Sequence, residues 1–247
     1  MSQQIKVERK IQFVGDANQE ANVEGNFLTK RACRVDWFDQ KALDETNGYT
    51  ITVDGTGDTV AVSGGGVIGV TMTTGSGDNE VEYFAPTPLV FDISQNPAIE
   101  AKIQITDVSG TVVFFGFSDA ITETSPNSTI DYADGTLAAA ATDAVGFVID
   151  GDKSSSAVYC ASIATGGSVA ATAAAPSTVW TDAQAKVLRV ELDSSGNARF
   201  YIDGVQVGYK ATAVTDVPLC AIINAGNREA AANTVYVRYL AKFQDIP

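Results

Sequence analysis

The chain has 247 residues, of which 45% are hydrophobic and 19% charged, a composition that excludes a disordered protein and allows one large domain with its own core. Its formal net charge of −14, from 30 acidic and 16 basic residues, argues against a phosphate backbone as ligand. Histidine is absent, which excludes Ser-His-Asp and Cys-His catalysis and zinc sites with imidazole ligands.

The first 30 residues differ in pattern from the rest of the chain. One short alternating run is followed by a polar stretch with little pattern; its apolar positions are Ile5, Val7, Ile11 and Phe13. We predict that residues 1–30 form an N-terminal arm that binds a partner by adding a strand to its exposed sheet edge. The alternative is that the run is an ordinary first strand of the main domain.

From about Thr50 onward, short alternating or apolar runs follow one another, separated by turns rich in Gly, Asp and Asn. Helical spacing never extends beyond a turn or two. The continuous apolar run 112–117 is typical of a strand buried on both faces. We predict an all-β, antiparallel sandwich that forms one domain over residues 31–247. The predicted strands occupy 49–53, 60–62, 67–72, 80–84, 99–105, 112–117, 145–150, 157–162, 186–208 and 235–240.

The stretch 186–208 gives the strongest evidence for antiparallel sheet. It contains three alternating runs, joined first by a turn that includes Gly196 and then by the tight turn Asp203-Gly204. We expect Gly196 to have a positive φ, which a β-branched residue resists. Earlier in the chain, the Ala-rich stretch 137–144 is interpreted as a short helix or a loop packed on the sheet.

Two acidic, glycine-containing loops, 54–58 and 78–80, supply oxygen atoms of the kind that calcium prefers. Neither has the EF-hand spacing, so we interpret both as turns, with calcium as the alternative, and predict no other metal or cofactor. Cys33, Cys160 and Cys220 are widely spaced, with no CxxC motif. We expect buried, reduced thiols, and one disulfide plus a free thiol as the alternative.

Six different short motifs follow one another in a distinctive order along the chain. They lie at 65–75, 96–102, 115–120, 143–147, 186–208 and 233–244. This order resembles the concanavalin A-like jelly roll, in the version common among structural proteins of tailed bacteriophages, over about residues 35–245. The resemblance implies a jelly-roll β-sandwich; the same fold carries lectins, glucanases and virion proteins, so function must come from the site.

Glucanases of that fold place their acids on one strand as Glu-x-Asp-x-x-Glu, a pattern that no segment of this chain contains. The pair Glu80 and Glu82 lacks the Asp and the third acid. We therefore predict no catalytic residues and a protein that is not an enzyme, with a glycosidase built from distant acids as the alternative. Trp37 and Trp180 are the candidates for stacking on a sugar, with packing in the core or at a sheet edge as the alternative for each.

The function that the resemblance implies is structural. We predict a phage capsid decoration or cement protein that bridges shell subunits. It would bind the major capsid protein or other virion proteins, assemble as a homo-oligomer, and belong to the virion after synthesis in the host bacterial cytoplasm. We expect no nucleic-acid or membrane partner, because the sequence has no basic excess, no apolar run of roughly 20 residues and no signal-peptide core. The alternatives are a lectin-like receptor- or carbohydrate-binding module of a head or tail fibre, and then a stand-alone carbohydrate-binding module.

Overall fold

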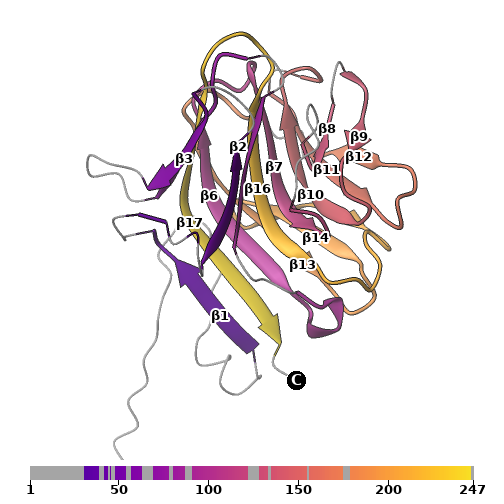
Figure 1. The fold of residues 1–247 in the computed structure, drawn as a ribbon. Coiled ribbons are helices and arrows are strands. Elements are labelled where there is room, and N and C mark those ends of the chain that lie inside the picture. Colours follow the sequence, from indigo (N-terminus) through magenta and orange to yellow (C-terminus); the bar gives the residue numbers. More distant parts are fainter. Residues whose placement is uncertain are drawn as a thin grey trace, which may run out of the picture.

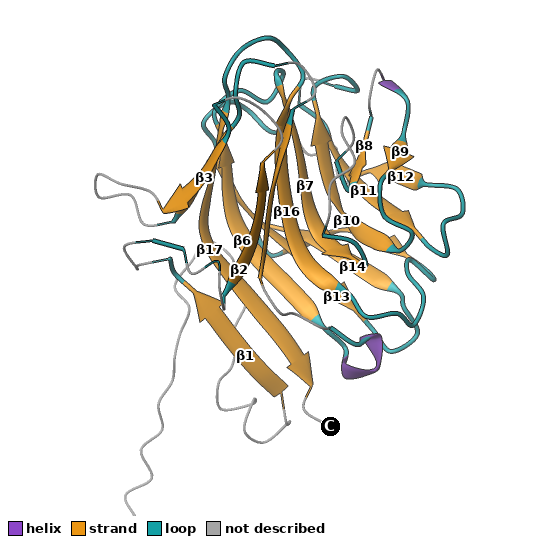
Figure 2. Cartoon of the chain, viewed as in Figure 1, coloured by secondary structure: helices purple, strands orange, loops and turns teal. Residues whose placement is uncertain are grey.

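The computed structural model describes residues 31–245, apart from 39–41, 44, 46–47, 54–56, 63–68, 78–79, 87–90, 122–127, 133–134, 155 and 175–178. Two antiparallel sheets pack face to face, and Figure 2 shows strands throughout both layers. The predicted all-β sandwich is confirmed. The predicted arm, with Ile5, Val7, Ile11 and Phe13, lies outside the described residues. Among the described residues, no helix is long and apolar enough to cross a membrane.

Sheet A has eight strands in the order β15-β14-β13-β6-β17-β4-β3, and β1 also pairs with β17 (Figure 1). Its strands are β1 (Arg31–Asp36), β3 (Thr59–Val62), β4 (Val70–Thr73), β6 (Ala98–Ile105), β13 (Ala185–Leu192), β14 (Ala198–Ile202), β15 (Val205–Lys210) and β17 (Thr234–Asp245). The last strand, β17, pairs with β4 through its first half and with β1 through its second half. The C-terminal strand therefore organises the middle of this sheet.

Sheet B has seven strands in the order β12-β11-β10-β7-β16-β5-β2. They are β2 (Tyr49–Val53), β5 (Val81–Pro86), β7 (Thr111–Ser118), β10 (Ala144–Asp150), β11 (Val158–Ile163), β12 (Ala170–Ala173) and β16 (Cys220–Asn227). Two further short strands, β8 (Ile130–Asp131) and β9 (Ala138–Ala139), pair with each other. A single 3₁₀ turn, Ile93–Gln95, precedes β6 within the described part of the chain.

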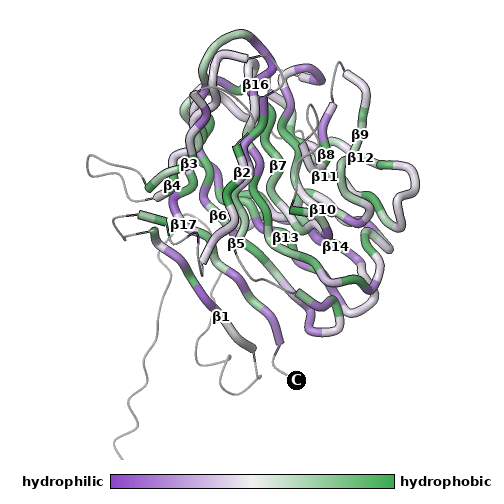
Figure 3. Tube along the Cα trace, in the orientation of Figure 1, coloured by the Kyte–Doolittle hydropathy of each residue, from purple (hydrophilic) through white to green (hydrophobic). Residues whose placement is uncertain are grey.

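The core lies between the two sheets because alternate side chains of each strand point inward. Figure 3 shows hydrophobic stretches along the central strands of both layers. Phe115 and Phe147 from sheet B meet Phe200 and Ile99 from sheet A in one buried cluster. Burying each such side chain contributes roughly 1.5–3 kcal/mol. Lateral hydrogen bonding and this shared core together fix the face that every strand presents to the outside.

Strand β7 is buried along its whole length, as the apolar run predicts. A second apolar cluster on the outer face of sheet B explains this; it includes Phe114, Val148 and Ile222. The connection between β7 and β10 covers that face with Ile130, and its Ala-rich part, 137–144, is a loop with the short strand β9. The loop interpretation is therefore the correct one of the two alternatives.

The three predicted runs in 186–208 are β13, β14 and β15, joined as antiparallel hairpins. Gly196 has a φ of +73°, and a Cβ at this position would lie 2.3 Å from the carbonyl oxygen of Val214. Asp203 and Gly204 have φ values of 50° and 79°, which is the backbone of a two-residue hairpin turn. Both turn predictions are confirmed.

Candidate functional site

The outer face of sheet A carries charged and aromatic side chains in an ordered pattern. In β6 and β13, Ile99 and Leu188 belong to the core, so the alternate residues Glu100, Lys102 and Arg189 lie on the outer face. Figure 1 shows β13, β6 and β17 as neighbours in this sheet. The strand register therefore decides which of the outward side chains come together.

Register places cations of neighbouring strands on a diagonal. Arg199 of β14 lies opposite Glu191 of β13, and Arg189 is two residues before Glu191 on β13. Arg189 lies opposite Glu100 of β6, and Lys102 is two residues further along. Each step moves one strand across and two residues along, so the side chains are diagonal neighbours within reach of one another.

Arg238 continues this diagonal on β17. The pairing of β17 with β6 shifts between Val237 and Leu240, and such a bulge re-aims the side chains within it. The Nη2 atom of Arg238 donates to Gln104 Oε1 at 2.7 Å, two residues from Lys102 on β6. We call Arg199, Arg189, Lys102 and Arg238 the cationic diagonal.

A second diagonal runs beside the first and consists of Glu191, Glu100, Tyr239 and Trp37; we call it the acidic–aromatic diagonal. The hydroxyl of Tyr239 donates to Glu100 Oε1 at 2.7 Å. The ring of Trp37 lies against that of Tyr239, with 5.3 Å between their centroids and a tilt of 47°. Trp37 is 49% exposed. The diagonal thus ends in an accessible aromatic ring next to a hydrogen-bonded carboxylate.

Arg189 connects the two carboxylates of the acidic–aromatic diagonal. Its Nη2 lies 2.5 Å from Glu191 Oε1, and its Nη1 lies 3.9 Å from Glu100 Oε2. Burial raises the pKa of Glu100, while the hydrogen bond from Tyr239 and the charge of Arg189 act in the opposite direction. Burial also raises the pKa of Tyr201, which is hydrogen-bonded to Glu191. The face therefore offers acceptors, donors and an open ring side by side.

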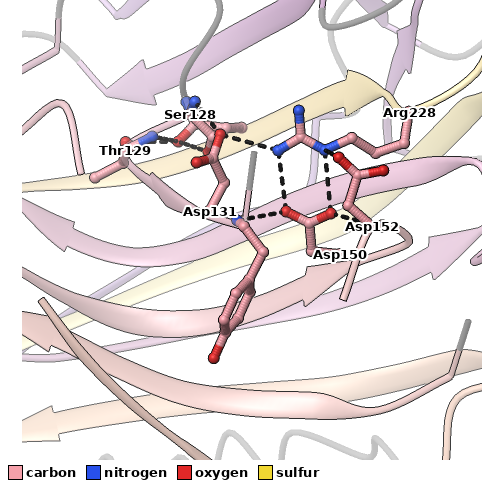
Figure 4. Close-up of polar contacts among 8 residues, drawn as sticks. Ser128, Thr129, Asp131, Asp150, Asp152 and Arg228 are labelled. Carbon is pink, nitrogen blue, oxygen red and sulfur yellow. Dashed lines mark hydrogen bonds and ion pairs between the residues drawn. The ribbon is translucent and has the colours of Figure 1, made fainter. Parts of the chain in front are cut away.

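The outer face of sheet B contains a different polar cluster, drawn in Figure 4. Arg228, directly after β16, donates through Nε and Nη2 to the two oxygens of Asp150, each at 3.0 Å. Its Nη2 is also 3.0 Å from Asp131 Oδ2, while Asp152 lies at the rim, 3.7 Å from Nε. The side chains of Arg228, Asp131 and Asp150 are almost completely buried. Burial raises the pKa of Asp131, partly offset by the N–H of Ser128 and by Arg228.

Hydrogen bonds from the preceding residues complete this cluster. Thr129 donates through Oγ1 to Asn224 Oδ1 at 2.6 Å, and Ser128 N–H donates to Asp131 Oδ2 at 2.8 Å. The bond to Asn224 fastens this segment to β16, and the N–H of Tyr132, which donates to Asp150 Oδ2 at 2.8 Å, fastens it to β10. The cluster is a clamp that holds the cover of sheet B in place, because the ion pair is bidentate and enclosed by protein. Sheet B is therefore closed on its outside where sheet A is open.

Sequence analysis did not identify this clamp. Arg228 and Asp150 are 78 residues apart and come from different turns, with no short-range pattern that joins them. The only local signal is that Asp150 ends an apolar run. The two diagonals were missed for the same reason, because the strand register and the bulge of β17 assemble them.

The structure separates the two tryptophans that were candidates for sugar stacking. Trp37 lies exposed on the outer face of sheet A. Trp180 is completely buried in the core, where its Nε1 donates to the carbonyl of Gln184 at 2.8 Å. Trp180 has no ring face open to a ligand, so it is not a stacking residue. The packing alternative applies to it.

Other predicted sites have simpler outcomes. Cys33, Cys160 and Cys220 form no disulfide; Cys160 and Cys220 are buried, and Cys33 is half-buried. Of the acidic loops, 54–56 and 78–79 lie outside the described residues, whereas Asp58 accepts a hydrogen bond from the N–H of Gly75 in another loop. In the described part of the chain, no three His, Cys, Asp or Glu side chains lie together as a metal site would require. Calcium stays the alternative to the turn interpretation.

No protein-family model and no curated protein matches the sequence. Solved structures do match in fold. The carbohydrate recognition domain of Emp47p has a TM-score of 0.60 at 11% identity, covering 88% of this chain and 98% of that one. The endo-1,3-β-glucanase of Streptomyces sioyaensis has a TM-score of 0.57 at 14% identity, covering 89% of this chain and 98% of that one. A glycoside hydrolase family 16 endo-glucanase from Bacteroides ovatus has a TM-score of 0.56 at 12% identity, covering 84% of this chain and 98% of that one.

At these identities the likeness shows the fold alone, which is the jelly-roll sandwich of lectin domains and family 16 glycoside hydrolases. The prediction that the chain is not an enzyme is contradicted, because endo-glucanases stand among its structural neighbours. The missing Glu-x-Asp-x-x-Glu pattern excludes only carboxylates placed on one strand. Acids from different strands also meet in this sheet, as Glu100 and Glu191 do on either side of Arg189.

Proposed function

We propose that the protein binds carbohydrate through the outer face of sheet A. The observation that carries the proposal is the exposed ring of Trp37, which rests on Tyr239 while the hydroxyl of Tyr239 is bonded to Glu100. An aromatic ring with one open face provides an apolar platform for a sugar ring. The neighbouring carboxylates and hydroxyls provide hydrogen-bond partners for its hydroxyl groups.

The cover on sheet B makes sheet A the favoured binding face. A glycan on the outer face of sheet B would have to displace the segment that contains Ile130 and Asp131. That displacement would break the bidentate pair between Arg228 and Asp150 and expose an apolar cluster to water. On sheet A the exposed groups Trp37 and Arg199 can be reached without such a displacement.

The fold likeness supports a carbohydrate ligand without carrying the proposal, since a carbohydrate recognition domain and endo-glucanases share this architecture. It also makes hydrolysis an outcome that must be measured. Glu100, whose pKa burial raises, and Glu191 are two carboxylates in different surroundings, the general condition for acid and base roles. An assay of reducing ends therefore belongs in any binding experiment.

The test uses the full chain on a panel of immobilised neutral and charged glycans, with Trp37→Ala as the variant. We expect retention of at least one glycan class and about tenfold weaker binding by Trp37→Ala. Val179→Ala is the matched control, because Val179 is also exposed, at 55%, but lies away from this face. Absence of glycan binding, or equal binding by Trp37→Ala, would overturn the proposal. Release of reducing ends that Glu100→Gln abolishes would assign catalysis to the same face.

A phage virion protein is the second candidate, and one observation favours it. The outer face of sheet A combines arginines with tyrosines such as Tyr201 and Tyr236, the residue types enriched in protein interfaces. Under this candidate the face would bind the major capsid protein or another virion protein as a homo-oligomer, after synthesis in the bacterial cytoplasm. Co-sedimentation with phage particles, compared between wild type and Arg238→Ala, tests it. Failure of wild-type protein to sediment with particles would contradict it.

A further inference from the structure

The cationic diagonal is unusual for a protein of this charge. The chain has a formal net charge of −14. The two diagonals together nevertheless hold four cations against two carboxylates, and even with Asp193, which lies 3.8 Å from Arg199, one positive charge remains in excess. Because fields at a surface depend on nearby charges more than on the total, this face can attract an anion that the rest of the molecule repels.

All three arginines of the diagonal lie against aromatic rings. A guanidinium on a ring face keeps its planar fork in a fixed orientation and loses little freedom when it binds an oxyanion. The distances from the guanidinium carbon to the ring centroid are 5.2 Å for Arg189 and Phe243, 5.9 Å for Arg199 and Tyr209, and 5.2 Å for Arg238 and Tyr236. The repeated arrangement indicates cations held in place before any ligand arrives.

The spacing of the cations suits an extended ligand. They occupy four consecutive strands, β14, β13, β6 and β17. Each of these strands contributes one cation to the diagonal, and neighbouring strands are about 4.8 Å apart. Arg199 has 41% of its side chain exposed, and its ion pair with Asp193, at 3.8 Å, is of the weak surface type. A chain with regularly repeated negative groups can contact several of these cations at once.

Resting on the proposed carbohydrate-binding function, we infer that the ligand is an anionic polysaccharide, a chain whose sugars carry carboxylate or sulfate groups. Its oxyanions bind the cationic diagonal, where the guanidinium fork matches the geometry of two oxygens. Its sugar rings and hydroxyls contact the acidic–aromatic diagonal, with Trp37 as the platform. The two diagonals lie side by side, so one extended ligand reaches both.

The experiment titrates the full chain with polygalacturonate, dextran sulfate and neutral dextran by calorimetry, at low and at moderate salt. We expect both anionic polymers, or one of them, to bind more tightly than dextran, and salt to weaken that binding. Arg199→Ala and Arg238→Ala should each weaken anionic binding about fivefold, the scale of one exposed charge pair. Arg199→Lys should restore only part of the loss, because lysine keeps the charge without the fork.

Lys153→Ala is the matched control, since it removes one exposed cation from the turn after β10, on the other sheet. We expect it to bind as wild type does. Equal weakening by Lys153→Ala would overturn the inference in favour of unspecific charge attraction. Thermal melting of each variant separates loss of binding from loss of folding.

The remaining outcomes separate this inference from the function on which it rests. Binding of a neutral glycan that needs Trp37 but not the arginines would overturn the anionic ligand and leave carbohydrate binding intact. Absence of any polysaccharide binding would overturn both. Salt-sensitive self-association that Arg199→Ala abolishes, without glycan binding, would assign the face to a second copy of the chain and overturn the inference.

Discussion

The outer faces of the two sheets are built from the same strand alternation and are used in opposite ways. Sheet B presents apolar residues such as Phe114 and Ile222 and is covered by the connection that contains β8 and β9. Sheet A presents alternating charges and rings around Arg189, and Arg199 and Trp37 are 41% and 49% exposed there. Each face also places one arginine between two carboxylates, Arg228 between Asp131 and Asp150 on sheet B.

The comparison shows that burial decides what an ion cluster does. Arg228 is enclosed, so its pairs hold the chain's own cover and are not available to a ligand. Arg189 is less enclosed, with 12% of its side chain exposed, and its partner Glu191 keeps 25% exposed. An arrangement of charges that closes one face can therefore serve recognition on the other. The predictions below test this contrast.

The largest effect is expected on the closed face. Arg228→Ala leaves Asp131 and Asp150 buried without their cation and should lower the free energy of unfolding by about 3–5 kcal/mol. Arg199→Ala, on the open face, should change it by less than about 1 kcal/mol. Urea unfolding of both variants measures the difference. Equal losses would show that the clamp contributes no more to the free energy of unfolding than a surface ion pair does.

A smaller effect is expected at the turn that positions Arg199. Gly196→Val puts a Cβ 2.3 Å from the carbonyl oxygen of Val214 and forces a β-branched residue to a φ of +73°, so we expect a loss of about 2 kcal/mol. Gly166→Ala is the control for φ alone, because its φ is +62° and its Cβ would meet Thr142 at an ordinary 3.7 Å. Its loss should be about 1 kcal/mol. Chemical denaturation measures both, and a smaller loss for Gly196→Val than for Gly166→Ala would contradict the steric argument.

The two faces should also share a pH dependence. Burial raises the pKa of Asp131 on sheet B and of Glu100 on sheet A, so the folded state holds protons that the unfolded state has released. Between the unfolded and folded pKa values, stability should therefore fall as pH rises, starting from about 3.8 for Asp131 and 4.5 for Glu100.

Unfolding at a series of pH values from about 3.5 to 7, compared between wild type and either Asp131→Asn or Glu100→Gln, isolates these contributions. Each variant should lose part of the decline that wild type shows. A variant curve parallel to the wild-type curve throughout would contradict the assignment for that residue.

Sequence pattern predicted the class, the hairpins of 186–208 and the doubly buried β7, because local alternation and turn residues encode them. It did not predict the site. The diagonals depend on the register between β13 and β6 and on the bulge near Val237, which core packing fixes over long separations. Trp37 and Trp180 lie in similar polar surroundings in the sequence, and only the fold decides that the second is buried.

The smallest effect on stability is expected at the residue with the largest expected effect on binding. Trp37 is half exposed and contacts Tyr239 on one side, so Trp37→Ala should change the free energy of unfolding by less than about 0.5 kcal/mol while glycan binding weakens. Trp180→Ala is the contrasting variant, because it empties a core site and should be strongly destabilising. Calorimetric melting beside glycan titration measures both properties on one sample. If Trp37→Ala unfolds as easily as Trp180→Ala, the ring of Trp37 serves packing, and the open face of sheet A loses its platform.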